Sequence, residues 1–183
     1  MIIGIAGTLG AGKGTVVEHL KSKGFAHYSV SGRLIEILKE RGLPEDRPHM
    51  SQLADDLADE HVGGILEVMH LKAQADGVID YVLESIHRQS EADYVRSLGG
   101  TILALDVDPH VRYERSQLRQ EGEKDNVTYE EFLAAIEREE KGNGDGKPNI
   151  NAVISTSDHT IMNDGTIEEL HGKVEEWLQT IGK

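Results

Sequence analysis

Cysteine is absent from the sequence, which excludes disulfide bonds and thiolate metal sites. Positive charge is scarce: 19 lysine and arginine residues stand against 33 acidic residues, and the formal net charge is −14. This imbalance argues against a nucleic-acid backbone or an anionic membrane as the main partner. Apolar runs are short, and none approaches the roughly 18 residues that a membrane-spanning helix needs. Because Met1 leads directly into the first apolar run, no room is left for a signal peptide, and we expect a soluble, cytoplasmic protein.

The 183 residues suffice for one α/β domain with its own core and are too few for two ordinary domains. Short apolar runs predict strands at residues 1–6, 25–30, 78–84, 101–107 and 159–163. Apolar residues spaced by three and four predict helices at residues 13–23, 34–41 with Ser31 as N-cap, 48–75 with a break at Gly63-Gly64, 89–97, 109 onward, 128–141 with a Thr128–Glu131 capping box, 150–154 and 166–181. The alternation of the two patterns predicts a parallel sheet covered on both faces, which binds ligands at the carboxyl ends of its strands.

The clearest chemical pattern is Gly-Thr-Leu-Gly-Ala-Gly-Lys-Gly-Thr at residues 7–15, between the first strand and the first helix. Its glycines let the backbone curl so that successive N–H groups form an anion nest at a helix N-terminus. Lys13 adds a cation for the outer phosphates, and the Thr15 hydroxyl is placed near a phosphate-bound Mg²⁺. The pattern matches the P-loop GxxxxGK, with Gly14 where Ser or Thr usually stands. We favour nucleotide binding over a glycine-rich turn that binds nothing, with contacts from Thr8, Leu9, Gly10, Ala11, Gly12, Lys13, Gly14 and Thr15.

An acidic residue, Glu84, ends the third expected strand beside this phosphate site. P-loop enzymes place an acid at such a position to hold Mg²⁺ through water or to orient the accepting oxygen. We favour this role for Glu84 over that of a solvated acid at a strand end, with Asp80 and Asp106 as the main alternatives.

Arginines are concentrated in one part of this acidic chain. Arg112, Arg115 and Arg119 stand three and four residues apart and so share one helical face, and Arg138 lies on the next expected helix. Guanidinium groups match phosphoryl oxygens and neutralise charge that develops during phosphoryl transfer. The alternative is a solvated face paired with nearby glutamates, but the adjoining glycine-rich loop at residues 142–148 favours a lid. We expect Arg115 and Arg119 to contact phosphate, and the pattern leaves Arg112 and Arg138 undecided.

A resemblance to a known family begins at residues 10–15. Gly10-Ala11-Gly12-Lys13-Gly14-Thr15 resembles the P-loop of adenylate kinase and related nucleoside monophosphate kinases, which reads GxPGxGKGT, and Leu9 stands where proline is usual. The arginine pattern of residues 108–119, with Glu131-Phe132 and Glu137-Arg138-Glu139, is similar to the lid of nucleotide kinases. It looks most like the lid of small archaeal and bacterial kinase-like ATPases related to adenylate kinase and dephospho-CoA kinase. Residues 163–170 resemble their closing segment, which lies against the adenine and so implies a nucleotide contact for Gly165.

The resemblance implies an α/β, P-loop NTPase fold: a five-stranded parallel sheet with helices on both faces and a helical lid. It implies a single domain over residues 1–183, with an acceptor-binding helical insert at about 31–76 and the lid at about 112–147. ATP and Mg²⁺ are the implied cofactors, and a small nucleotide is the implied substrate; the oligomeric state stays open. The implied catalytic residues are Lys13, Glu84, Arg115 and Arg119, with Mg²⁺ near Thr15 and Glu84.

The acceptor side departs from this family. Adenylate kinases carry a Ser-Thr-Gly-Asp turn followed by Leu-Arg, whose arginine holds the acceptor phosphate. Here Arg33 stands where Asp is expected and Glu36 where Arg is expected. We expect Arg33 and Arg88 to supply cations to the acceptor from shifted positions, together with the turn residues Ser31 and Gly32.

The sequence supports three functions, which we rank. The first is an ATP-dependent phosphotransferase that moves the γ-phosphoryl group to a nucleoside monophosphate or similar small nucleotide, whose anionic oxygen needs no strong base. The second is a kinase acting on a hydroxyl, as dephospho-CoA kinases do, with Glu84 or Asp106 as the base; the absence of any Asp before Asp46 counts against it. The third is an ATP-binding regulator with slow hydrolysis.

The histidines and the tryptophan have simpler interpretations. The nine histidines lack the spacings of a metal site, so we expect them on helix surfaces or at the edge of the core. Trp177 lies on the apolar face of the last expected helix, where it predicts core packing.

Overall fold

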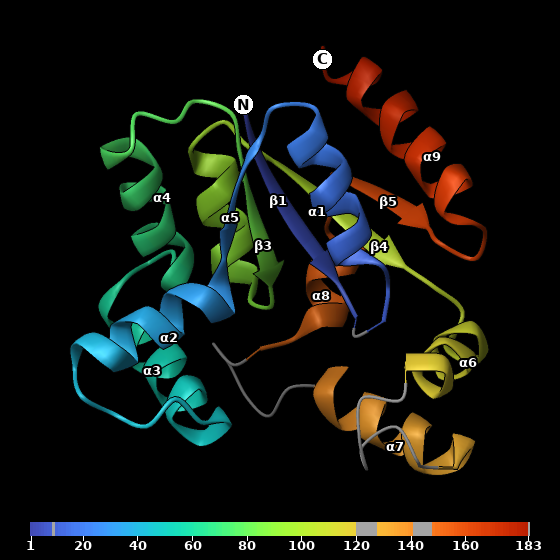
Figure 1. Ribbon diagram of the computed structural model, residues 1–183, viewed down its shortest axis with the longest axis horizontal. Helices are drawn as coiled ribbons and strands as arrows, with labels where there is room; N and C mark the ends of the chain where they lie inside the picture. Colours follow the sequence, from blue (N-terminus) through green and yellow to red (C-terminus); the bar gives the residue numbers. More distant parts are fainter. Residues whose placement is uncertain (9, 120–127, 141–147, 183) are drawn as a thin grey trace.

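The computed structural model describes residues 1–8, 10–119, 128–140 and 148–182 (Figure 1). Within these ranges the strands are β1 (Ile2–Gly7), β2 (Ala26–Ser29), β3 (Tyr81–Ile86), β4 (Thr101–Asp106) and β5 (His159–Met162). They form one parallel sheet in the order β2-β3-β1-β4-β5. The predicted five-stranded parallel sheet is therefore confirmed, and β1, which leads into the P-loop, lies at its centre.

Helices cover both faces of the sheet, as predicted (Figure 1). They are α1 (Lys13–Ser22), α2 (Val30–Glu40), α3 (Arg47–Glu60), α4 (Ile65–Ala75), α5 (Gln89–Ser97), α6 (Pro109–Arg119), α7 (Tyr129–Glu140), α8 (Ile150–Ser155) and α9 (Ile167–Thr180). Successive side chains of β1 point to opposite faces. Ile3 and Ile5 join the core under α1 and α9, whereas Ala6 joins the core under α2–α5 and α8.

Helix caps follow the chemistry of the sequence. At the start of α7 the predicted capping box is present: the Thr128 amide donates to Glu131 Oε2 at 2.8 Å, and the Glu131 amide donates to Thr128 Oγ1 at 3.2 Å. Thr166 and Glu169 form a second box at α9. The predicted start of α2 is wrong, because this helix begins at Val30 and not at residue 34. Its N-cap is Ser29, whose hydroxyl accepts a hydrogen bond from the Gly32 amide at 3.3 Å.

The third strand lies further along the chain than predicted. Val78 and Ile79 were assigned to it as an apolar run, but Ile79 is 80% exposed and β3 begins only at Tyr81. The strand continues to Ile86, so Glu84 lies inside it and does not end it. Beside Glu84 the register between β1 and β3 shifts, and Ser85 adopts a left-handed conformation with φ of 73°. This conformation strains a non-glycine residue and marks an irregularity next to the P-loop.

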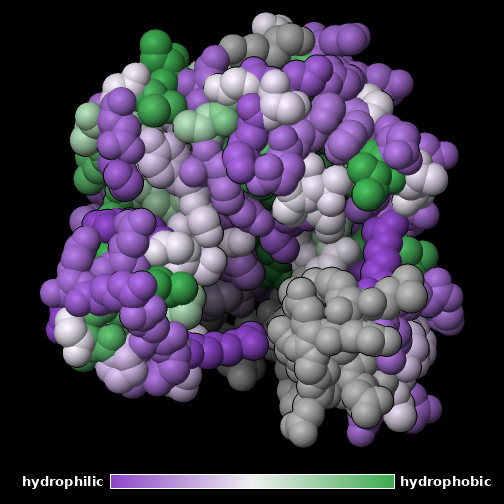
Figure 2. All heavy atoms as spheres, viewed as in Figure 1, coloured by the Kyte–Doolittle hydropathy of each residue, from purple (hydrophilic) through white to green (hydrophobic). Residues whose placement is uncertain are grey.

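Two helical regions flank the carboxyl ends of the central strands. Helices α2 and α3 lie on one side and α6 and α7 on the other, with the end of β1 between them (Figure 1). Figure 2 shows the surface hollowed between these two regions. The predicted ligand edge of the sheet is thus accessible from this face. Among the described residues, no helix is both long and apolar enough to cross a membrane.

Candidate nucleotide site

The loop between β1 and α1 has the backbone of an anion cradle. Gly10 (φ 81°) and Gly12 (φ 95°) adopt left-handed conformations that side chains disfavour. Gly12 is the N-cap of α1, and no described side chain caps its amides. The first turn of α1 therefore presents its N–H groups and the positive end of the helix dipole to the loop, which suits a phosphate group.

Lys13 lies folded over this loop. Its Nζ atom donates hydrogen bonds to the carbonyls of Gly7 at 2.8 Å and Thr8 at 3.0 Å. Thr8 is buried, and its Oγ1 atom has no hydrogen-bond partner among the described residues. An uncapped helix start, a lysine held over the loop and an unsatisfied hydroxyl form a donor set that fits the phosphates of ATP.

Small-molecule binding sites in proteins span roughly 300–1,000 Å³. The hollow beside the P-loop has a volume of about 500 Å³. Arg115 reaches it from α6 and donates from Nη2 to the Gly165 carbonyl at 3.1 Å. Of the predicted nucleotide residues, the pocket brings together Gly10, Gly12, Thr15, Arg115 and Gly165. The rest of its lining is Asn163, Thr166, Ile167 and Leu170.

Asn163, at the end of β5, is a pocket residue to which the sequence analysis gave no role of its own. Its side chain is buried and donates from Nδ2 to the Ala11 carbonyl at 2.9 Å. Its position just beyond a strand, at the edge where ligands bind, is the signal that could have identified it.

Glu84 faces the P-loop from β3 and is held by a histidine. His27 Nε2 on β2 lies 2.8 Å from Glu84 Oε2, and both side chains are about a fifth exposed. The hydrogen bond from His27 lowers the pKa of Glu84, and the charge of Lys13 adds to this effect against the cost of burial. A charged carboxylate here suits indirect binding of Mg²⁺ beside Thr15. A histidine within a strand carries no sequence signal for such a pair, and His27 was expected at a helix surface or core edge.

The two alternative acids lie in different places. The Asp80 carboxylate forms an ion pair with the Met1 amine at the amino ends of the strands, on the opposite edge from the P-loop. Asp106 ends β4 next to β1, and its Oδ1 atom accepts a hydrogen bond from the Val107 amide at 2.9 Å. Only Asp106 of these two shares the edge with Glu84.

His87 follows β3 on the same edge. Part of the His87 side chain faces solvent, but the protein atoms around its ring lower its pKa to about 4. Burial is the main cause, and the positive charges of Lys13 and Arg88 contribute. His87 is therefore neutral at pH 7 and adds no positive charge to the acceptor side.

The two arginines predicted for the acceptor are engaged in ion pairs. Arg33 Nη1 lies 3.0 Å from Glu36 and 3.3 Å from Glu40 on its own helix. Burial would lower the pKa of Arg33, but the hydrogen bonds to these two glutamates raise it overall. Of the neighbouring turn residues, Ser31 is exposed, with its Oγ 3.1 Å from Ser29 Oγ, and the Gly32 amide bonds to Ser29.

Arg88 is more deeply buried than Arg33, and its ion pairs join separate elements. It is 5% exposed, forms an ion pair with Asp55 on α3, and lies 3.6 Å from Glu91 on α5. Burial raises the pKa of Glu91, while the amide of His87 and Arg88 itself oppose this shift. Arg88 thus joins the region of α3 to the start of α5.

Three arginines of the predicted lid remain: Arg112, which the structure describes, and Arg119 and Arg138, whose side chains it does not describe. Arg112 is buried on α6 with its guanidinium 5.9 Å from the centre of the Phe132 ring on α7, which indicates packing between these helices. The side chains of Arg119 and Arg138, and the whole of Leu9, lie outside the described part of the structure, so their predicted roles stay predictions.

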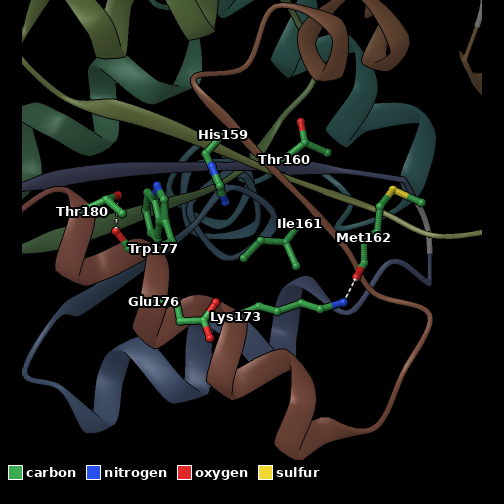
Figure 3. A pocket seen from close by; sticks show the side chains of 8 residues that line it. All are labelled: His159, Thr160, Ile161, Met162, Lys173, Glu176, Trp177 and Thr180. Carbon is green, nitrogen blue, oxygen red and sulfur yellow. Dashed lines mark hydrogen bonds between the residues drawn. The ribbon is translucent and has the colours of Figure 1, made fainter.

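A separate hollow of about 400 Å³ lies between β5 and α9 (Figure 3). The rings of His159 and Trp177 lie 6.2 Å apart at 17° to one another, and Lys173 Nζ donates to the Met162 carbonyl at 2.6 Å. Trp177 is 3% exposed and belongs to the core, which confirms its predicted packing role. None of the predicted site residues lines this hollow.

The strand order, the loop after β1 and the pocket beside it define a P-loop nucleotide-binding protein. A family model described as an AAA domain matches residues 3–141, and the chain belongs to this family. A UPF0200 protein of Pyrococcus horikoshii is 28% identical over 190 residues, covering 99% of this chain and 97% of the relative.

Solved structures show the same fold at low identity. Shikimate kinase from Aquifex aeolicus superposes with a TM-score of 0.60 at 17% identity, with all of both chains covered. Dephospho-CoA kinase from Campylobacter jejuni superposes with a TM-score of 0.56 at 15% identity, covering 98% of this chain and 96% of the other. The predicted P-loop fold, of the kind found in small kinases, is confirmed.

Proposed function

We propose that the protein transfers the γ-phosphoryl group of ATP to a small acceptor molecule. The observation that carries this proposal is a pocket lined by both the uncapped start of α1 and Arg115. Lys13 lies over the adjoining loop, and its charge acts on Glu84. Bound Mg·ATP supplies the phosphoryl group and neutralises part of its charge. The loop amides and Lys13 would hold the phosphates, Thr15 and Glu84 would hold the Mg²⁺, and Arg115 and Arg119 would stabilise the transferring group.

The acceptor belongs to one of two classes. A nucleoside monophosphate is the first hypothesis, and it requires cations that bind its phosphate. Arg33 and Arg88 meet this need only if they leave their carboxylate partners. A hydroxyl-bearing acceptor requires no such exchange, so these ion pairs favour a hydroxyl acceptor as the second candidate. The solved neighbours named for shikimate and dephospho-CoA are kinases of that second kind.

The test is ADP release from Mg·ATP with each candidate acceptor in turn: AMP, CMP, UMP, GMP, their deoxy forms, dephospho-CoA and shikimate. A large stimulation by a monophosphate supports the first class, and stimulation by a hydroxyl compound supports the second. If no compound raises ADP release above the rate without an acceptor, the kinase proposal is contradicted. If the protein still binds ATP, and Lys13→Ala abolishes that binding, the result indicates an ATP-binding regulator. Lys21→Ala, which removes an exposed lysine of α1 paired with Glu18, is the matched control.

A further inference from the structure

The turn after β5 is tied to the P-loop by a buried side chain. Asn163 is 6% exposed, and its Nδ2 atom donates to the Ala11 carbonyl at 2.9 Å. Its own amide donates to the Asp106 carbonyl at 2.7 Å, which fixes its backbone to the end of β4. Both the side chain and the backbone of Asn163 therefore have a defined position before any ligand binds.

The bond to Ala11 determines where the next amide points. A trans peptide is planar, and its C=O and N–H groups point in opposite directions. Because the Ala11 carbonyl points to Asn163, the Gly12 N–H points away from Asn163. This amide belongs to the N-cap of α1, where anions bind.

The space around Gly12 shows how closely the two segments fit. A Cβ atom at Gly12 would lie 2.4 Å from Asn163 Nδ2, and Gly12 has φ of 95°. The glycine is thus needed for its conformation and also because the Asn163 amide occupies the adjacent space.

The same turn also contacts the lid side. Asp164 Oδ1 accepts a hydrogen bond from the Asp108 amide at 3.0 Å, and the Gly165 carbonyl accepts one from Arg115 at 3.1 Å. Three consecutive residues therefore link the P-loop, the β4–α6 connection and the α6 arginine.

We infer that Asn163 is a positioning residue for the nucleotide: its buried amide holds the Ala11–Gly12 peptide so that the Gly12 N–H is available to phosphate. This inference rests on the nucleotide binding in the proposed function. It does not depend on which acceptor is used or on phosphoryl transfer itself.

The experiment compares Asn163→Ala, Asn163→Asp and Asn163→Ser with Asn149→Ala. Asn163→Asp keeps the shape but places a carboxylate against the Ala11 carbonyl, whereas Asn163→Ser keeps a short donor. Asn149 caps α8 through a hydrogen bond from the Ala152 amide at 3.0 Å and is not part of the P-loop or its pocket, so its loss is a structural control. The measurements are ADP affinity by calorimetry and hydrogen exchange of residues 10–14 without nucleotide.

We expect Asn163→Ala and Asn163→Asp to weaken ADP binding about tenfold and to accelerate exchange in residues 10–14, with Asn163→Ser intermediate. Asn149→Ala should lower the melting temperature without either effect. If the Asn163 variants bind ADP as tightly as wild type and show unchanged exchange, the inference is overturned.

The failure of the proposed function can be distinguished from the failure of this inference. If the wild type binds ADP but transfers phosphoryl to no acceptor, the kinase proposal fails and the affinity comparison still decides the role of Asn163. A wild type that binds no nucleotide overturns both proposals.

Discussion

The cations proposed for the nucleotide, Lys13 and Arg115, and those proposed for the acceptor, Arg33 and Arg88, are held in different ways; we call the two groups the nucleotide side and the acceptor side. On the nucleotide side, Lys13 and Arg115 donate to backbone carbonyls. On the acceptor side, Arg33 and Arg88 each face two carboxylates. A phosphate oxygen replaces a neutral carbonyl readily, because the charged acceptor forms the stronger hydrogen bond. Replacing a carboxylate leaves that carboxylate without its partner, which is costly where it is buried. If the proposed function holds, phosphate can replace the partners of the nucleotide side at little cost, whereas the ion pairs of the acceptor side stabilise the fold.

The largest expected effect on stability follows from the loss of Arg88. We expect Arg88→Ala to reduce the free energy of unfolding by about 3–5 kcal/mol. The substitution leaves the buried Glu91 and the half-buried Asp55 without their cation. Arg33→Ala should cost no more than about 1 kcal/mol, because its partners Glu36 and Glu40 are exposed and remain hydrated without it. Urea unfolding measures both, and Arg88→Lys retains the charge if the alanine variant does not fold. Equal midpoints for Arg88→Ala and wild type would contradict a structural role for Arg88.

Lys13 tests the other half of the comparison. Lys13→Ala should leave urea unfolding nearly unchanged, since the lysine contacts loop carbonyls. It should reduce phosphoryl transfer by about 100- to 1,000-fold, as expected when one phosphate-binding donor is removed. Calorimetry with ADP and the ADP-release assay check the two effects, with Lys21→Ala as the control. A strong loss of stability with intact ADP binding would reverse the comparison.

Ser85 tests whether the irregularity between the two sides is strained. Its φ of 73° costs a non-glycine residue about 1–2 kcal/mol, which glycine avoids. Glycine loses more conformational entropy than serine on folding, which offsets part of this gain. Ser85→Gly should therefore stabilise the protein by up to about 1 kcal/mol. Ser51→Gly, at an exposed position within α3, should instead destabilise the protein by about 0.5–1 kcal/mol. Urea unfolding separates the two signs, and a destabilised Ser85→Gly would show that the serine side chain outweighs the strain.

The smallest effect concerns the neutral histidine of the acceptor side. The folded pKa of His87, about 4, lies below its ordinary value, so protons bind more readily to the unfolded chain. The associated stability is fully present above about pH 6.5 and is lost as the pH falls toward 4. His87→Asn should therefore lose less stability than wild type between pH 7 and pH 5. Thermal unfolding at both values checks this, and parallel losses would contradict a neutral His87 in the folded protein.

The nucleotide side was predictable because its chemistry lies in local sequence. A P-loop is built from consecutive backbone groups, so residues 7–15 between a strand and a helix predict both its position and its ligand. The helix at residues 89–97 was predicted with its observed bounds. The conformation of the loop depends also on Asn163, which lies 152 residues from Ala11 in the chain, and no local pattern indicates that bond.

The acceptor side was less predictable because its ion pairs join separate elements. Arg88 meets Asp55 across 33 residues, and Glu84 meets His27 across 57. The resemblance to nucleotide kinases suggested cations for an acceptor phosphate, but it carried no information on these carboxylate partners. The error in β3 has a local cause: Val78 and Ile79 are apolar, yet they belong to the turn before the strand.

The central place of β1 also affects how the chain is synthesised. Residues 2–7 are made before their neighbours, which lie at residues 81–86 and 101–105. An emerging chain therefore carries an apolar, unpaired strand until β3 has been made, a state that favours aggregation. Fragments that end before β4 leave one edge of this strand open, so they are expected to require a chaperone or to precipitate.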